Sequence, residues 1–116
     1  MEQNSYTYHV RKALLYINEY HNRPITLTTA AQALGVNKCY LCKLFKEETG
    51  QNFTDYLNQI KIDHSKKLLM GYGRSMLEIS MEAGFNSQNY FNILFKRYTG
   101  MTPVQYRNIH GAALAG

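Results

Sequence analysis

The sequence has few of the residues that mark a secreted, membrane-bound or loosely linked protein. Only two cysteines occur among its 116 residues, so no disulfide framework is implied. No run approaches the roughly 20 apolar residues of a membrane-spanning helix, and the first residues lack the apolar core of a signal peptide. Two prolines and no glycine- or serine-rich stretch leave no flexible linker. We therefore expect a soluble, cytoplasmic protein without membrane association, built as one compact module or two very small ones.

Signals of catalysis and metal binding are also missing. There is no glycine-rich phosphate loop, no G-x-S-x-G and no pair of carboxylates on one helix face, so we expect no enzyme and no catalytic residue. Cys39 and Cys42 are spaced as C-x-x-C, but zinc needs two further ligands and the four histidines are scattered. A thioredoxin-like site needs a β-α-β context, and no strand is predicted. We expect two free thiols, no metal and no cofactor, while a thiol switch that blocks binding on oxidation stays open.

The sequence has an excess of positively charged residues, and residues 37–46 carry several of them on one face of a predicted helix. The net charge of +5 favours a polyanionic partner. Leu41, Leu44 and Phe45 form the apolar stripe of an amphipathic helix, and Asn37 is a natural N-cap. The outer residues of this predicted helix are Lys38, Cys39, Cys42, Lys43 and Lys46. Such a face suits a DNA major groove, although a solvated lysine face has the same pattern.

The sequence repeats itself after fifty positions. Upstream of the turn the shift is forty-nine, and one extra residue near Asn86 accounts for the change. The matched pairs include Tyr40 with Tyr90, Phe45 with Phe95, Lys46 with Lys96, Thr49 with Thr99, Gly50 with Gly100 and Tyr56 with Tyr106. Each copy reads as a short helix, a turn with glycine and a second helix, so two helix-turn-helix units are predicted.

The second copy has its own outer face. Ser87 caps the predicted helix 88–98, whose core face is Phe91, Leu94 and Phe95. Its outer residues are Gln88, Asn89, Asn92, Ile93, Lys96 and Arg97.

Seven helices are predicted in all, which gives an all-α fold. Beside the two helices above, they cover residues 5–20, 27–34, 52–70, 75–83 and 103–109, with 111–116 expected to fray. Capping signals at Thr26, Asn52, Ser75 and Thr102 support four of these starts. Two helix-turn-helix subdomains, 5–51 and 72–110, are thus joined by a long central helix, 52–71, that is roughly 28 Å long.

Two stretches resemble the DNA-binding module of AraC/XylS-type transcription regulators. They read Gly35-Val-Asn-x-x-Tyr-Leu-x-x-Leu-Phe-Lys-x-x-Thr-Gly and Gly84-Phe-x-x-x-x-Tyr-Phe-x-x-x-Phe-Lys-x-x-Thr-Gly-x-Thr-Pro-x-x-Tyr-Arg. The resemblance spans residues 25–107 and implies regulation of transcription, with the third and sixth helices reading double-stranded DNA. Three residues depart from the family pattern, namely Ser80 and Ser65 for alanine and Lys61 for arginine. We expect Ser80 to loosen the second unit slightly.

The resemblance also implies partners. Many family members carry a ligand-sensing domain or a response-regulator receiver, and none is visible in this sequence. The opening residues 8–20 look more like members that follow a receiver, which favours the C-terminal effector part of a two-component regulator over a stand-alone one. RNA polymerase is a further implied partner. Whether the protein activates or represses stays open.

Reading roles follow from the family pattern and from side-chain chemistry. Lysines pair with guanine, Asn and Gln with adenine, and an exposed isoleucine meets a thymine methyl. Base contacts are assigned to Lys38, Cys39, Cys42 and Lys43 in the first groove and to Gln88, Asn89, Asn92 and Ile93 in the second. Phosphate contacts are assigned to Lys38, Lys46, Lys96 and Arg97, with the starts of the second, fifth and seventh helices as anion sites.

The separation of the two reading helices predicts the size of the DNA site. Successive major grooves on one face of DNA lie about 34–36 Å apart, which is more than the length of the central helix. We therefore expect an asymmetric site of about 20 bp, and we expect the DNA to bend when both reading helices engage. The alternative function is a basic helical module that binds an acidic protein. RNA ranks third, because the A-form major groove is too deep and narrow for these helices.

Overall fold

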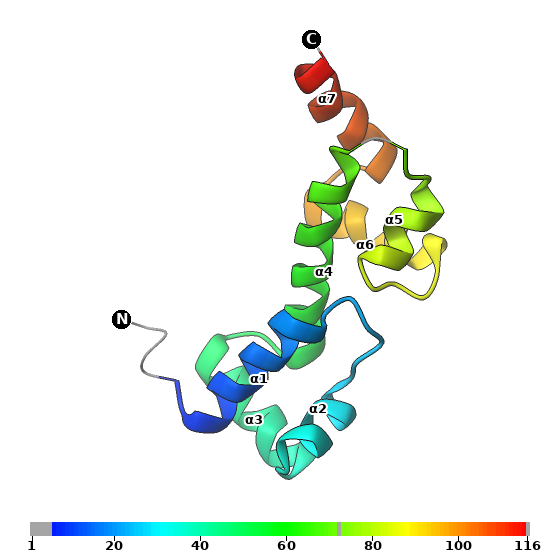
Figure 1. Ribbon diagram of the computed structural model, residues 1–116. Helices are drawn as coiled ribbons and strands as arrows, with labels where there is room; N and C mark the ends of the chain where they lie inside the picture. The colour runs from blue at the N-terminus through cyan, green and yellow to red at the C-terminus, as the bar shows by residue number, and fades with distance from the viewer. Residues whose placement is uncertain (1–5, 72, 116) are drawn as a thin grey trace. The chain divides into compact units, whose positions relative to one another are not determined.

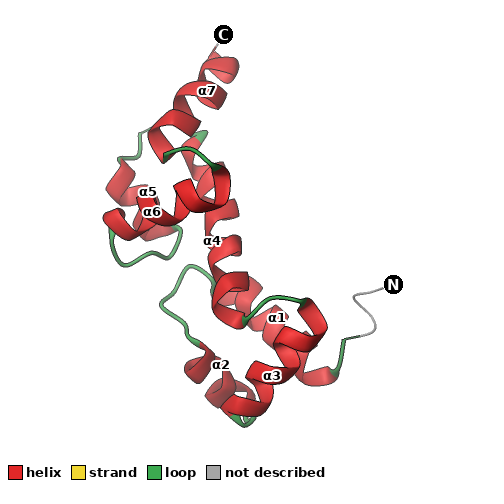
Figure 2. Ribbon diagram, turned by 180° about the vertical axis from the view of Figure 1, so that it is seen from behind, coloured by secondary structure: helices red, strands yellow, loops and turns green. Residues whose placement is uncertain are grey.

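Seven helices form the regular structure of the residues that a computed structural model of the protein describes (Figure 1). The structure describes the backbone of residues 6–71 and 73–115 and the side chains of residues 6–71 and 73–111. The helices are α1 (Tyr8–Tyr20), α2 (Leu27–Leu34), α3 (Lys38–Thr49), α4 (Phe53–Leu69), α5 (Met76–Glu82), α6 (Gln88–Thr99) and α7 (Pro103–Ala115). Over these described residues Figure 2 shows no strand, and the predicted all-α class is confirmed.

The outer ends of the first and last helices differ from the prediction. The first helix begins at Tyr8 and not at Ser5, which lies outside the described residues. Thr7 precedes it in an extended conformation, with ψ at 165°. The last helix does not end near Ile109 but continues to Ala115. The C-terminal stretch was expected to fray, but it is rich in alanine, which has the highest helix propensity of all residues.

The chain divides into two compact units. One unit contains Met1–His21 and Ile25–Leu57, and the other contains Asn22–Pro24 and Asn58–Gly116, so α4 contributes residues to both. In the first unit α1, α2 and α3 pack against one another, and in the second α6 packs against α5 and α7 (Figure 1). None of the helices over the described residues combines the length and the apolar character that crossing a bilayer requires.

The first unit is built around Phe45 of α3. Its ring is fully buried and meets the rings of Phe53 and Tyr56 edge-on, at centroid distances of 5.6 Å and 5.5 Å. Edge-to-face pairs of this kind add to the stabilisation that burial alone provides. Ala30 and Ala31 of α2 are also buried, as predicted, and their small size allows close packing between helices.

The second unit has its own apolar cluster, made by α4, α5 and α6. Its buried members are Ile62, Leu69, Ile79, Ala83, Phe85, Phe91, Leu94 and Phe95. Two fully buried serines stand among these residues, and each hydroxyl donates to a carbonyl three residues earlier. The distances are 2.6 Å from Ser65 to Ile62 and 2.7 Å from Ser80 to Leu77. Both hydroxyls are therefore hydrogen-bonded within their own helices.

Lys61 of α4 is buried in the second unit, which the sequence did not predict. Only 8% of its surface is exposed, and its Nζ lies 5.5 Å from the centroid of the Phe85 ring. Burial lowers the pKa of the Lys61 ammonium, because the charged form loses hydration. The aromatic face offsets part of that cost through a cation–π interaction.

Candidate nucleic-acid interface

The two predicted reading helices begin with the same cap. Asn37 Oδ1 accepts a hydrogen bond from the Tyr40 amide at 3.0 Å, and Ser87 Oγ accepts one from the Tyr90 amide at 2.9 Å. Each cap satisfies an amide that the first turn leaves without a helical partner. The polar groups of Asn37 and Ser87 thus hold the helix starts, and both residues are exposed.

The two helices also end in the same way. The hydroxyls of Thr49 and Thr99 donate to the carbonyls of Phe45 and Phe95, at 2.8 Å and 2.7 Å. The same hydroxyls accept the amides of the residues two positions later, each at 3.2 Å. Gly50 and Gly100 follow in the left-handed region, with φ values of 83° and 84°. The repeated Thr-Gly therefore encodes a helix stop that terminates both reading helices at the same register.

The outer faces of both helices are accessible. On α3 the predicted contact residues Lys38, Cys39, Cys42, Lys43 and Lys46 are all exposed. On α6 the residues Asn89, Ile93, Lys96 and Arg97 are exposed, whereas Gln88 and Asn92 are half-buried. Ile93 keeps 49% of its surface exposed, which is high for an isoleucine on a folded helix.

The cations of these faces are not neutralised within the chain. Among the described residues, Lys38, Lys43, Lys46, Lys96 and Arg97 form no ion pair with a carboxylate. Glu48, near the end of α3, instead accepts the Thr7 amide at 2.8 Å, which ties its carboxylate to the start of α1. The positive charge on both faces is therefore left for an external anion.

Two tyrosines that the sequence did not assign to the interface also lie exposed on these helices. Tyr40 and Tyr90 occupy equivalent positions and are 51% and 48% exposed. Tyr40 packs edge-on against His9, at 5.9 Å between centroids, and Tyr90 against Phe85, at 6.3 Å. Their recurrence in the repeat was the available signal, but it equally fits a structural role.

The two cysteines are free and exposed on the outer face of α3. Across the described residues no group of three or more His, Cys, Asp or Glu is placed to hold a metal ion.

Comparison with known proteins identifies the family. Residues 30–109 match a family model described as a helix-turn-helix domain, which covers most of the chain and includes both reading helices. The chain belongs to the AraC-type helix-turn-helix family. Proteins of this family are transcription regulators that bind DNA sequence-specifically, and they are not enzymes. The interpretation drawn from the two repeated stretches is thereby confirmed.

The AraC-type domain is similar to parts of longer regulators. It is 39% identical over 105 residues to the uncharacterised transcriptional regulatory protein YesN of Bacillus subtilis. That match covers 88% of this chain and 28% of YesN. Two further relatives are covered over 58% and 35% of their length, so the chain spans less than two thirds of these curated proteins.

Structures of related domains have the same fold. The C-terminal domain of AraT, a response regulator from Geobacillus stearothermophilus, superposes with a TM-score of 0.87 at 31% identity. The comparison covers 90% of this chain and 88% of that domain. The DNA-binding domain of AdpA, in complex with a target DNA, superposes with a TM-score of 0.84 at 20% identity, over 90% of this chain and 94% of that one. The seven-helix fold with two helix-turn-helix units is therefore confirmed.

Proposed function

We propose that this AraC-type domain reads duplex DNA with the outer faces of α3 and α6, as part of a transcription regulator. The observation that carries the proposal is the equivalence of the two helices. Both begin with a side-chain cap and end with Thr-Gly, and both expose cations that no carboxylate of the described residues neutralises. A helix that is apolar inside and cationic outside is suited to a major groove, where it contacts phosphates and base edges together.

The repeat register separates two kinds of contact. One exposed cation recurs in both helices, as Lys46 and Lys96, whereas four outer positions in the first two turns differ between them. The differing pairs are Lys38 with Gln88, Cys39 with Asn89, Cys42 with Asn92 and Lys43 with Ile93. Phosphates have the same chemistry at every base pair, while base edges differ. We assign Lys46 and Lys96 to phosphate contact and the four differing pairs to base readout.

Further phosphate contacts come from residues at the edges of these faces. Lys38 and Arg97 are exposed cations, and Tyr40 and Tyr90 are exposed residues with hydroxyl donors near the starts of the two helices. Asn37 and Ser87 use their side chains as caps, so we assign them to the interface through the first-turn backbone and not through base readout.

Because the two reading faces differ, the DNA site is asymmetric. Two successive major grooves require a site of about 20 bp, with bending of the duplex when both helices engage. In this arrangement residues 5–51 and 72–110 act as the two helix-turn-helix subdomains and residues 52–71 as the linker helix.

Similarity to YesN and AraT supports a sensory partner. AraT is a response regulator, and 90% of the present chain superposes on the C-terminal domain of AraT. We propose that this domain acts together with a receiver or ligand-sensing domain, and with RNA polymerase at the promoter.

Selection of bound sites from a random duplex pool, followed by affinity measurements on the selected site, tests the proposal. Lys46→Ala and Lys96→Ala each lower affinity on every sequence and reduce the slope of log affinity against log salt by about one. Asn89→Ala relaxes sequence preference at one or two base pairs and costs about 1–3 kcal/mol on the selected site. Lys67→Ala is the matched control, because Lys67 is an exposed lysine of α4 outside both reading faces.

A second readout uses the cysteines of the first reading face. Bound DNA should slow the alkylation of Cys39 and Cys42 by iodoacetamide, because both thiols then face the groove. The control is Cys39→Ser, Cys42→Ser, Thr54→Cys, which places the thiol at an exposed position of α4. Equal protection of both proteins, or no enrichment of any sequence during selection, would instead favour a basic helical module that binds an acidic protein.

A further inference from the structure

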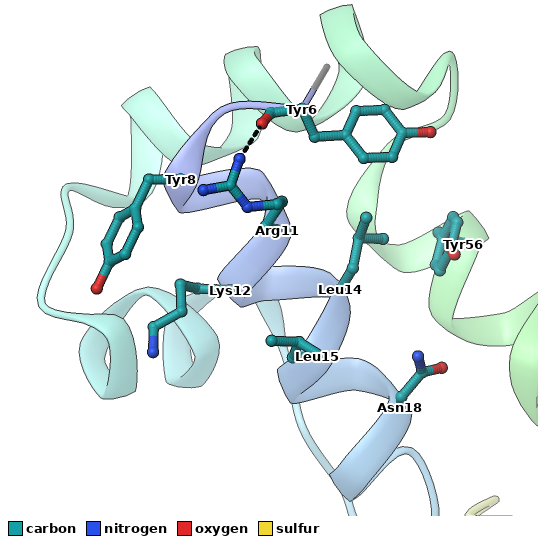
Figure 3. A pocket seen from close by; sticks show the side chains of 8 residues that line it. All are labelled: Tyr6, Tyr8, Arg11, Lys12, Leu14, Leu15, Asn18 and Tyr56. Atoms are coloured by element: carbon teal, nitrogen blue, oxygen red, sulfur yellow. Dashed lines mark hydrogen bonds between the residues drawn. The ribbon is translucent and has the colours of Figure 1, made fainter. Parts of the chain in front are cut away.

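A groove on the outer side of α1 is not used by the proposed DNA contacts. Its volume is about 460 Å³, and it lies in the first unit, between side chains of α1 and Tyr56 from the start of α4 (Figure 3). Leu14 extends from α1 toward Tyr56, and Asn18 lies one turn further along the helix (Figure 3). Burial raises the pKa of the Tyr56 phenol, and the nearby Tyr6 adds to this shift.

The groove is bordered by large apolar side chains that remain exposed. Leu15 and Tyr8 keep 63% and 59% of their surface accessible. They are seven residues apart on α1 and therefore lie two turns apart on one face of the helix. Val10, Ala13 and Ile17 are fully buried on the opposite face. The first helix is thus apolar on both sides, although packing within the unit accounts for only one of them.

Two cations flank this second apolar face. Arg11 Nη1 donates to the Tyr6 carbonyl at 2.6 Å, and Lys12 Nζ lies 5.6 Å from the centroid of the Tyr8 ring. Both residues are exposed, and no carboxylate among the described residues pairs with either of them. The groove therefore offers apolar contacts at helical spacing together with two uncompensated positive charges.

We propose that this groove is a docking surface for an acidic amphipathic helix of a partner domain. Apolar residues at heptad spacing on that helix would pack against Leu15 and Tyr8, and flanking Asp or Glu side chains would meet Arg11 and Lys12. A second copy of this chain fits less well. A two-fold interface brings the same patch to both sides, so Arg11 and Lys12 would face their own equivalents.

A helix docked in this groove would lie against α1, which contacts the first reading helix, α3. The Thr7 amide binds Glu48 of α3, and the His9 ring packs against Tyr40 of α3. A partner bound to α1 therefore rests on the helix that braces α3.

The test uses helical peptides of about three heptads, with leucines on one face and either glutamates or lysines beside them. Fluorescence anisotropy measures their binding to the protein in the presence of saturating duplex DNA, which occupies the basic reading faces. The glutamate peptide is expected to bind at least about tenfold more tightly than the lysine peptide. Leu15→Gln should weaken it by about tenfold or more, since a buried leucine side chain contributes that much to packing.

Two variants complete the design. Leu77→Gln is the matched control, because Leu77 is a comparably exposed leucine in the other unit, and it should leave peptide binding unchanged. Arg11→Glu combined with Lys12→Glu should reverse the preference toward the lysine peptide. Unchanged helicity of each variant, together with unchanged DNA affinity of the two leucine variants, would show that the fold is retained.

Several outcomes would overturn the proposal. It is wrong if the glutamate peptide does not bind, if saturating DNA removes its binding, or if Leu15→Gln binds it as the parent does. It is also wrong if sedimentation shows a dimer of the chain that Leu15→Gln dissociates and the charge reversal does not. None of these outcomes depends on the assignment of base contacts, because the peptide binds α1 and the base contacts are assigned to α3 and α6.

Discussion

Replacing the glycine that ends each reading helix by alanine should destabilise the protein through backbone strain alone. Gly50 and Gly100 adopt φ values of 83° and 84°, a region that L-residues enter at a cost of about 1–2 kcal/mol. A Cβ built at either position meets no atom within 4 Å, so steric overlap adds nothing. Alanine also restricts the unfolded chain, which returns about 0.4–1 kcal/mol. We therefore expect a net loss of about 1 kcal/mol for each substitution.

Urea unfolding followed by circular dichroism measures this loss, since a lower midpoint at constant slope reports lower stability. Gly71→Ala is the matched control, because Gly71 does not have a positive φ and its built Cβ would make ordinary contacts with Arg74 and Leu68 at 3.5 Å and 3.6 Å. Gly50→Asn should cost less than Gly50→Ala, because asparagine tolerates the left-handed region better.

The result that would refute this reasoning is a Gly50→Ala variant as stable as the parent, or an equal loss in Gly71→Ala. DNA affinity provides a second check. At temperatures where the variants stay folded, their affinity for DNA should change less than about threefold, because the strain lies beyond the outer faces that we propose contact DNA.

Three other substitutions have definite expectations. Ser80→Ala should change stability by less than about 1 kcal/mol, because the better helix propensity of alanine balances the loss of the hydrogen bond to Leu77; urea midpoints decide. Lys61→Met should be more stable than the parent at pH 7. Because the pKa of Lys61 is lower in the folded state than the ordinary value of 10.5, the parent gains stability as the pH rises through the folded pKa toward that value. The stability advantage of Lys61→Met should therefore shrink over that pH interval, as measured by urea unfolding at each pH. Asn37→Ala should cost about 1 kcal/mol in thermal or urea unfolding by removing the cap of α3.

The parts of the fold that the sequence predicted are those decided by neighbours within a few residues. The caps at Thr26, Asn37, Ser75 and Ser87 each join a side chain to an amide three positions later, and all four hydrogen bonds are present. Such signals need no knowledge of tertiary structure, because both partners lie in one helical turn. The same holds for most outer residues of α3 and α6, whose exposure follows from helical periodicity, although Gln88 and Asn92 are half-buried.

What the sequence did not predict depends on distant partners. Lys61 is buried because Phe85, in the loop before α6, covers its side chain, and no local pattern distinguishes it from a solvated lysine. The exposed face of α1 is the opposite case. Leu15 follows the half-buried Leu14 in the chain, and only the packed unit shows that no other part of that unit covers it.

The repeat shows which residues hold the reading helices and which are free to vary. Residues that match between the copies are buried rings, helix ends, one exposed tyrosine and one exposed lysine, whereas the positions that we propose to contact bases differ at every pair. Because Phe45 and Phe95 fill their cores and Thr49 and Thr99 close their helices in the same way, both outer faces are presented from equivalent frames. A substitution on an outer face therefore costs little stability, while one in the frame affects folding before it affects DNA. Sequence preference can then change at one reading helix without change at the other, as the proposed asymmetric DNA site requires.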